Sequence, residues 1–253
     1  EQKIEKHYPA RKKAMIFAAG LGTRLRPLTD NMPKALVKIK GKPLIEHVLE
    51  KLVFNGFNDI VVNVHHFADM IEAWSQEFVK NDICKDHNVR ISFSDERNEL
   101  LETGGGIANA KNLLKAQNPD QGFLVHNVDI FSNVDLQQVI QNSNNNVDAV
   151  LIVSKRATAR YFVFDNNMRL VGWTNIKTQE VKSPYLEVHE ELSNLQIETL
   201  ETTNYKLRAF AGIHYLKNNL FDFMDSWPRK FSITDFYINM CDKLSFKGFE
   251  PDN

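Results

Sequence analysis

Strand-like and helix-like segments alternate from residue 13 to about residue 154, which predicts an α/β fold with a mostly parallel sheet covered by helices on both faces. The composition agrees: the 253 residues are 43% hydrophobic and 25% charged, enough for one large α/β domain or two small ones. No apolar run approaches the roughly 20 residues of a membrane helix, and a net charge of −1 gives no basic field. We therefore expect neither a membrane nor a nucleic acid as a partner.

Each element of this first stretch has a local reason. The first strand is a short apolar run that breaks at Gly20, and the later strands are similar runs bounded by polar or turn residues. The first helix has an apolar stripe at helical spacing (Leu44, Val48 and Leu52) and Gly56 as a stop signal. The expected strands are residues 14–19, 59–64, 89–93, 122–126 and 148–154. The expected helices are residues 43–55, 68–79, 106–115 and 136–141.

From residue 161 onward the pattern changes. Residues 161–165 and 169–173 alternate in hydrophobicity and are joined by the turn pair Asn166-Asn167, which predicts a hairpin. Residues 181–204 are polar and predict irregular structure. Residues 205–216 predict a strand and residues 233–244 a helix. We expect this second part to extend the sheet.

The cysteine content and the first residues bear on the cellular compartment. Cys84 and Cys241 are the two cysteines of the chain, and neither belongs to a CxxC motif or a Cys/His cluster. Neither a disulfide framework nor a structural zinc site is therefore expected. The charged first residues lack the apolar core of a signal peptide. Together these features predict a cytoplasmic location.

The most informative motif is the loop after the first strand. Gly20 and Gly22 expose backbone N–H groups with no Cβ atoms in the way, and Thr23 and Arg24 follow directly. Arg24 can donate to two phosphate oxygens at once, and Lys34 adds a point charge further along. This set favours a polyphosphate, and hence a nucleoside triphosphate. The alternative is a tight turn beside solvated surface cations.

Two established phosphate motifs do not fit this loop. A Walker A motif is excluded because no GKS or GKT sequence follows, and a dinucleotide fingerprint would need a third glycine where Leu25 stands. Leu25 and the cationic loop therefore argue against a dinucleotide oxidoreductase.

Two further motifs carry polar chemistry. In residues 101–107 (LETGGGI), three glycines at a predicted helix start offer free N–H donors and room for a flat base or ribose, although such a run can also be a flexible loop. Asp129 comes just past a predicted buried strand. In parallel sheets this edge is where ligands bind, although Asp129 alone could be a polar residue that leads into a loop.

Residues 18–47 (AAGLGTRLRPLTDNMPKALVKIKGKPLIEH) resemble the signature of the sugar-1-phosphate nucleotidyltransferases, with glycine, threonine, arginine, proline and lysine positions in order. The resemblance implies a Rossmann-like three-layer sandwich with a mostly parallel central sheet. It implies a reaction that joins a nucleoside triphosphate to a sugar 1-phosphate and releases pyrophosphate with the help of Mg²⁺. On this basis residues 1–12 form an extension. Residues 13–253 form one domain, with a nucleotide-binding half (13–154) and a sugar-binding half (155–253).

The same resemblance assigns roles to individual residues. The residues implied to bind the nucleotide are Ala18, Ala19, Gly20, Gly22, Thr23, Glu102, Gly104 and Gly105. The residues implied to be catalytic are Arg24, Lys34 and Asp129, with Asp129 as the Mg²⁺ ligand. The residues implied to bind the sugar are Asn127, Lys177 and Gly212. Glu102 could instead cap its helix, and Lys177 could be a solvated lysine. Asn127 and Asp129 match an N-G-D pattern in which Val128 replaces the usual glycine.

The choice of substrates is less sharply indicated. The LETGGGI segment is most similar to the N-acetylmuramate 1-phosphate uridylyltransferases, whose product feeds cell-wall sugar recycling, and it favours UTP. The alternatives are GTP with mannose 1-phosphate, CTP with a choline-type phosphate, and a nucleotide-binding regulatory domain without turnover. The sequence gives no indication of oligomeric state.

One family feature is missing from the sequence. Family members carry a second metal-binding aspartate near the C-terminus, typically in a W-x-D-x-G segment, and no such segment is present here. Asp252 lies in a different context, and we do not assign the role to it. We expect that the sequence stops short of that segment. The alternative is a degenerate protein that is catalytically weak.

Overall fold

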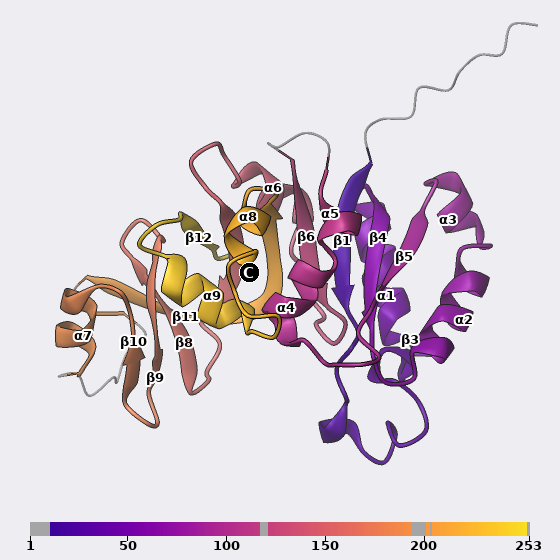
Figure 1. The fold of residues 1–253 in the computed structure, drawn as a ribbon, viewed down its shortest axis with the longest axis horizontal. Helices are drawn as coiled ribbons and strands as arrows, with labels where there is room; N and C mark the ends of the chain where they lie inside the picture. Colours follow the sequence, from indigo (N-terminus) through magenta and orange to yellow (C-terminus); the bar gives the residue numbers. More distant parts are fainter. Residues whose placement is uncertain (1–10, 117–120, 194–200, 203, 252–253) are drawn as a thin grey trace, which may run out of the picture.

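The computed structural model describes residues 11–116, 121–193, 201–202 and 204–251. Its centre is a large mixed sheet with helices against both faces (Figure 1). The strands are β1 (Lys12–Phe17), β2 (Lys38–Ile39), β3 (Lys42–Pro43), β4 (Phe57–Val64), β5 (Arg90–Asp95), β6 (Gly122–Asn127), β7 (Ala149–Ser154), β8 (Arg160–Asp165), β9 (Leu170–Asn175), β10 (Glu180–Lys182), β11 (Tyr205–Lys217) and β12 (Phe246–Phe249).

The helices connect these strands and cover the sheet. The α-helices are α1 (Leu44–Phe54), α2 (Ala68–Phe78), α3 (Asp82–Asp86), α4 (Glu102–Asn109), α5 (Lys111–Leu114), α6 (Leu136–Gln141), α7 (Leu186–Ser193), α8 (Leu220–Met224) and α9 (Ile233–Met240). Two 3₁₀ turns, η1 (Thr23–Leu25) and η2 (Lys34–Leu36), lie in the segment after β1. No helix in the described ranges is long and apolar enough to cross a membrane.

Strand β1 lies at the centre of the parallel part of the sheet. It pairs with β4 on one side and with β6 on the other, and β5 extends the parallel set beyond β4. The register places Met15 of β1 beside Val61 and Val125. Because parallel strands end at the same edge of a sheet, the loops after β1, β4, β5 and β6 emerge together.

Strand β11 joins this sheet to the antiparallel strands of the second half. Its residues 213–217 pair with β6, its residues 205–208 pair with β8, and its register against β7 shifts between Phe210 and His214. Strands β8, β9 and β10 form an antiparallel meander, and β12 pairs with β7. Strands β6 and β7 both run antiparallel to β11, so the loop after β7 lies at the same edge as the loop after β6.

The core has two layers because side chains alternate across the sheet. Ala14 and Ile16 pack with α1, α2, α3 and α6 on one face, whereas Met15 packs with α4, α5, α8 and α9 on the other. A third cluster, with Val188 and Leu192 of α7, covers the β8–β10 strands. Helix α7 lies at the opposite end of the molecule from α2 and α3 (Figure 1).

This architecture confirms the predicted α/β sandwich and the hairpin at Asn166-Asn167. Three local expectations were wrong. The helix expected at 106–115 begins at Glu102 and is divided into α4 and α5 at Ala110. Residues 181–204, expected to be irregular, include part of β10 and all of α7. Strand β1 begins at Lys12, inside the expected extension, and residues 1–10 of that extension lie outside the described residues.

Two histidines are buried in the central strands. His126 of β6 is 0% exposed and His214 of β11 is 3% exposed. Burial lowers the pKa of His126 to about 4 and that of His214 to about 3. Nδ1 of His214 lies 2.5 Å from the Tyr237 hydroxyl, and Nε2 of His126 has no hydrogen-bond partner among the residues described. Both rings are therefore neutral in the folded protein at pH 7.

We expect the free energy of unfolding to fall as the pH is lowered from 6.5 toward 4, because the unfolded chain binds protons there that the folded chain does not. Each histidine contributes a slope of up to about 1.4 kcal/mol per pH unit in this window. Urea unfolding at a series of pH values measures the slope. His126→Leu removes one of the two groups and should make the slope shallower; an unchanged slope would contradict the assignment.

Candidate active site

A cavity of about 350 Å³ lies at the carboxyl edge of the parallel strands, and we call it the glycine-loop cavity. The loops after β1, β5 and β6 and the start of α4 form its walls. Most of the residues that the sequence singles out line it: Ala18, Ala19, Gly20, Arg24, Lys34, Glu102, Asn127 and Asp129. The parallel topology therefore brings together groups that are up to 111 residues apart in the chain, from Ala18 to Asp129.

Asn63 holds the first turn of this cavity. It is the last but one residue of β4, and its Oδ1 accepts hydrogen bonds from the N–H groups of Ala18 at 2.7 Å and Ala19 at 3.2 Å. These two donors are therefore already satisfied, and what they fix is the direction in which the chain leaves β1. Asn63 was not among the residues predicted from the sequence, although its position as a polar residue inside the apolar run of β4 was a usable signal.

Glu96 fixes the orientation of that asparagine. Glu96 Oε1 accepts from Asn63 Nδ2 at 2.8 Å, and Oε2 accepts from the N–H of Leu101 at 3.1 Å. The residue is 3% exposed, and burial raises its pKa, although the two hydrogen bonds oppose that shift. Glu96 comes directly after β5, at the same edge as Asp129. That position was the signal that could have identified it.

Two cations and three carboxylates line the cavity: Arg24, Lys34, Glu96, Glu102 and Asp129. Lys34 Nζ forms an ion pair with Asp129 Oδ2, which joins the segment after β1 to the loop after β6. The side chains of Lys34 and Asp129 are 21% and 37% exposed, so both remain accessible to a ligand. Arg24 lines the same cavity, and its side chain has no ion pair within the described part of the chain. The geometry thus assembles the three residues expected to handle phosphates.

Gly22 and Thr23 lie beside the cavity and do not line it. Gly22 has φ +65°, its carbonyl accepts from Leu25 N–H and Thr29 Oγ1, each at 2.8 Å, and a Cβ atom there would meet Thr29 Cγ2 at 2.8 Å. The turn itself therefore requires glycine at position 22. Thr23 is exposed in η1. A nucleotide contact by either residue stays a prediction.

The run of three glycines has a different role from the one expected. The N–H groups of Gly104 and Gly105 are not free, because both donate to the carbonyl oxygen of Phe231, at 2.9 Å and 3.1 Å. A Cβ atom on Gly104 would lie 2.3 Å from the Phe231 ring, and one on Gly105 would lie 2.4 Å from the Arg229 carbonyl. The expectation of free donors at these positions was wrong, since the glycines let α4 pack closely against the 229–231 segment.

The residues just before those glycines face the cavity instead. Glu102 and Thr103 line it, and Glu102 has φ +63°, an uncommon conformation for a side chain other than glycine. Glu102 forms no side-chain cap of α4, so the alternative role as a helix cap is not supported. Thr103 Oγ1 accepts from the N–H of Ile233 at 3.0 Å and so ties the cavity to the start of α9.

Asn127 and Gly212 lie against each other. Gly212 is buried at the register shift of β11 with φ +74°, and a Cβ atom there would lie 2.6 Å from Asn127 Nδ2. The space beside Gly212 is therefore filled by the Asn127 carboxamide. It is not open to the sugar ring that the sequence-based prediction placed there. Val128 is buried, with its N–H bonded to the Phe17 carbonyl at 3.2 Å, so the missing glycine of the N-G-D pattern is accommodated.

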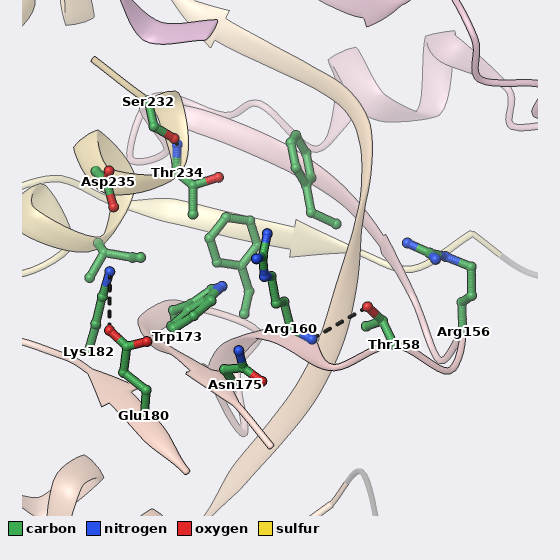
Figure 2. Close-up of a pocket in the computed structure, with 13 residues that line it drawn as sticks. Arg156, Thr158, Arg160, Trp173, Asn175, Glu180, Lys182, Ser232, Thr234 and Asp235 are labelled. Atoms are coloured by element: carbon green, nitrogen blue, oxygen red, sulfur yellow. Dashed lines mark hydrogen bonds and ion pairs between the residues drawn. The ribbon is translucent and has the colours of Figure 1, made fainter. Parts of the chain in front are cut away.

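Two further cavities continue from the first. Asp129 also lines a central cavity of about 590 Å³ between the loops after β6 and β7. Phe210 and Arg156 of the central cavity in turn line an outer cavity of about 470 Å³, which is bounded by β8, β9, β10 and the start of α9 (Figure 2). Lys177 is exposed in the turn between β9 and β10 and lines none of the three. The structure thus does not bring Lys177 to the site.

The comparisons with known proteins agree with this geometry. The chain matches the model of the nucleotidyl transferase family over residues 13–167. It is 52% identical over 105 residues to the N-acetylmuramate alpha-1-phosphate uridylyltransferase of Caulobacter vibrioides, a match that covers 42% of each protein. It is 35% identical over 144 residues to the mannose-1-phosphate guanylyltransferase catalytic subunit beta of Xenopus tropicalis, covering 56% of this chain and 38% of that protein.

A solved structure of UDP-glucose pyrophosphorylase from Acinetobacter baumanii has the same fold, with a TM-score of 0.66, 18% identity and coverage of 95% of this chain and 86% of that one. The chain belongs to the nucleotidyl transferase family, as residues 18–47 predicted. It spans less than half the length of each of the two sequence relatives.

The close packing of α4 predicts a stability effect. Gly104→Ala should lower the free energy of unfolding by about 1–3 kcal/mol, because the new methyl group collides with the buried Phe231 ring. Urea unfolding measures the change. Gly20→Ala is the matched control, since nothing lies within 4 Å of the position that its methyl group would take, and it should unfold like the parent. Equal stability of the Gly104 variant and the control would refute this role for the glycine.

Proposed function

We propose that this chain joins a nucleoside triphosphate, with UTP favoured, to a sugar 1-phosphate, with N-acetylmuramate 1-phosphate favoured. The products would be a nucleotide sugar and pyrophosphate. The observation that carries the proposal is the convergence of Arg24, Lys34 and Asp129 on one cavity behind a glycine loop. Asp129 also lines the adjoining central cavity, so an acceptor placed there would meet the nucleotide at this carboxylate.

The proposed reaction is a displacement at phosphorus. An oxygen of the sugar 1-phosphate attacks the α-phosphorus of the nucleotide and forms a P–O bond, while the bond from the α-phosphorus to the bridging oxygen breaks and pyrophosphate leaves. The attacking phosphate is already an anion near neutral pH, so no strong general base is required. Arg24 and Lys34 stabilise the charge on the triphosphate and hold it in position.

We further propose that Mg²⁺ assists this reaction. The described residues contain no group of three His, Cys, Asp or Glu side chains that could enclose a metal. A single carboxylate nevertheless fits this ion, because Mg²⁺ is commonly held by one or two carboxylates together with phosphate oxygens and waters. Asp129 would hold the ion, and its ion pair with Lys34 uses Oδ2 and leaves Oδ1 available. When bound, Mg²⁺ would supply charge neutralisation on the phosphates.

Two observations support the preferred substrates. The Caulobacter relative, named as a uridylyltransferase of N-acetylmuramate phosphate, is 52% identical over its matched region, whereas the Xenopus guanylyltransferase is 35% identical over its own. The LETGGGI segment, whose Glu102 and Thr103 line the glycine-loop cavity, points the same way. GTP with mannose 1-phosphate is the second candidate. For the preferred pair, the reaction would take place in the cytoplasm and serve cell-wall sugar recycling.

Asp129→Asn should reduce the rate of pyrophosphate release at least about a hundredfold, because a neutral carboxamide holds Mg²⁺ much less tightly than a carboxylate and the neutralisation of the phosphates in the transition state is lost. The rate is measured with UTP, N-acetylmuramate 1-phosphate and Mg²⁺, together with the thermal midpoint to verify folding. Asp82→Asn, an exposed carboxylate of α3, is the control and should retain activity. Near-parental activity of the Asp129 variant would eliminate the metal assignment.

A substrate panel tests the specificity. Pyrophosphate release is measured with UTP, GTP, CTP and ATP, each paired with N-acetylmuramate 1-phosphate, N-acetylglucosamine 1-phosphate and mannose 1-phosphate. We expect the highest kcat/KM for UTP with N-acetylmuramate 1-phosphate. Preference for GTP with mannose 1-phosphate would replace our assignment with the second candidate. Tight nucleotide binding without pyrophosphate release would indicate a regulatory domain instead.

A further inference from the structure

The outer cavity contains two arginines whose charge is not neutralised by a carboxylate within the described chain. Arg156 lies in the loop after β7 and Arg160 begins β8, and neither side chain takes part in an ion pair among the described residues. The third cation of this cavity differs, because Lys182 pairs with Glu180 at 3.4 Å and lies 5.2 Å from the centre of the Trp173 ring. The remaining carboxylate, Asp235, belongs to the first turn of α9.

Both arginines are directed at the same space. Figure 2 shows the Arg160 side chain rising into the middle of the cavity, with Arg156 extending toward it from the neighbouring loop and Thr234 facing it from α9. Asp235 lies on the far side, near Lys182. The cavity is therefore electropositive on the Arg156–Arg160 side, which is the side it shares with the central cavity through Arg156.

The remaining wall suits a sugar ring. Phe162 is 2% exposed, and it lines the cavity together with the partly buried Phe210 and Trp173. The exposed parts of the Phe210 and Trp173 rings can pack against the C–H groups of a pyranose, and Asn175 and Thr158 add hydrogen-bonding groups to the lining. The volume of about 470 Å³ lies in the range of cavities that bind small molecules.

The reacting phosphate of the acceptor is not the anion that we expect Arg156 and Arg160 to bind. In the proposed reaction the sugar 1-phosphate meets the nucleotide at Asp129, which lines the glycine-loop and central cavities but not the outer one. Arg156 and Phe210 connect the outer cavity to the central one. An acceptor that keeps its phosphate at Asp129 would therefore present a different substituent to Arg160.

We propose that Arg160, together with Arg156, recognises a second negative charge on the acceptor, a carboxylate carried by the sugar. The inference rests on the proposed function, because it places the acceptor relative to the reacting phosphate. It makes Arg160 a determinant of specificity for an acidic sugar over a neutral one. N-acetylmuramate 1-phosphate has such a carboxylate, and N-acetylglucosamine 1-phosphate has the same ring without it.

Arg160→Gln should lower kcat/KM for N-acetylmuramate 1-phosphate by about tenfold or more, mainly through KM, because a charge-assisted hydrogen bond is lost. The value for N-acetylglucosamine 1-phosphate should change less than about twofold, so the preference for the acidic sugar disappears. Lys206→Gln is the matched control: it removes a cation from β11, which pairs with β8, outside the cavity, and should leave both values unchanged. An equal loss for the two sugars in the Arg160 variant would overturn the proposal.

A binding measurement separates this inference from the proposed reaction. Calorimetry with free N-acetylmuramate and free N-acetylglucosamine requires no nucleotide and no turnover. The parent protein should bind the acidic sugar more tightly, and Arg160→Gln should remove the difference. If the parent protein turns over no sugar phosphate and this binding preference is nevertheless present, the proposed function fails while the carboxylate site stands. Equal affinity of the parent protein for both sugars would reject the site.

Discussion

The parallel pairing of β1 with β4 and β6 is the constraint on which the site depends. It sends the chain out of the sheet at one edge three times, so that the glycine loop, Asn63 and Asp129 meet there. The buried bonds from Asn63 to Ala18 and Ala19 then set the course of the loop, and Glu96 holds the asparagine in place. The placement of the functional groups thus depends on buried hydrogen bonds at the ends of the strands.

Much of this arrangement could be predicted from sequence, for a physical reason. Alternating strands and helices allow few topologies, and right-handed parallel connections place polar residues after strands at a common edge. The sequence could therefore predict that Lys34 and Asp129 lie at the same site, although 95 residues separate them. Asn63 escaped notice because its partners are backbone groups of another strand. Its place inside an apolar run marks it as unusual, but the run does not show which groups its carboxamide binds.

The second half was harder to predict because its structure depends on non-local pairings. Strand β10 is three residues long and is held by β9 and by the cover of α7, so its own sequence carries almost no signal. The family resemblance implied Lys177 as a sugar ligand, whereas Arg160 and not Lys177 lines a cavity in the structure. The prediction for Gly104 and Gly105 was wrong for a similar reason: their small size allows close packing against the 229–231 segment, more than 120 residues away.

The continuity of β11 has a mechanical consequence. Strand β11 has 13 residues and is hydrogen-bonded to β6 at one end and to β8 at the other, and it also pairs with β7 on both sides of the register shift at Gly212. Bending β11 would break ladder hydrogen bonds to its neighbouring strands β6, β7 and β8, which makes a hinge motion within this strand costly. The β8–β9 hairpin, in contrast, is hydrogen-bonded to one end of β11, through residues 205–208. Substitutions of its side chains leave the parallel pairing of β1 with β4 and β6 unchanged, because neither β8 nor β9 pairs with those strands.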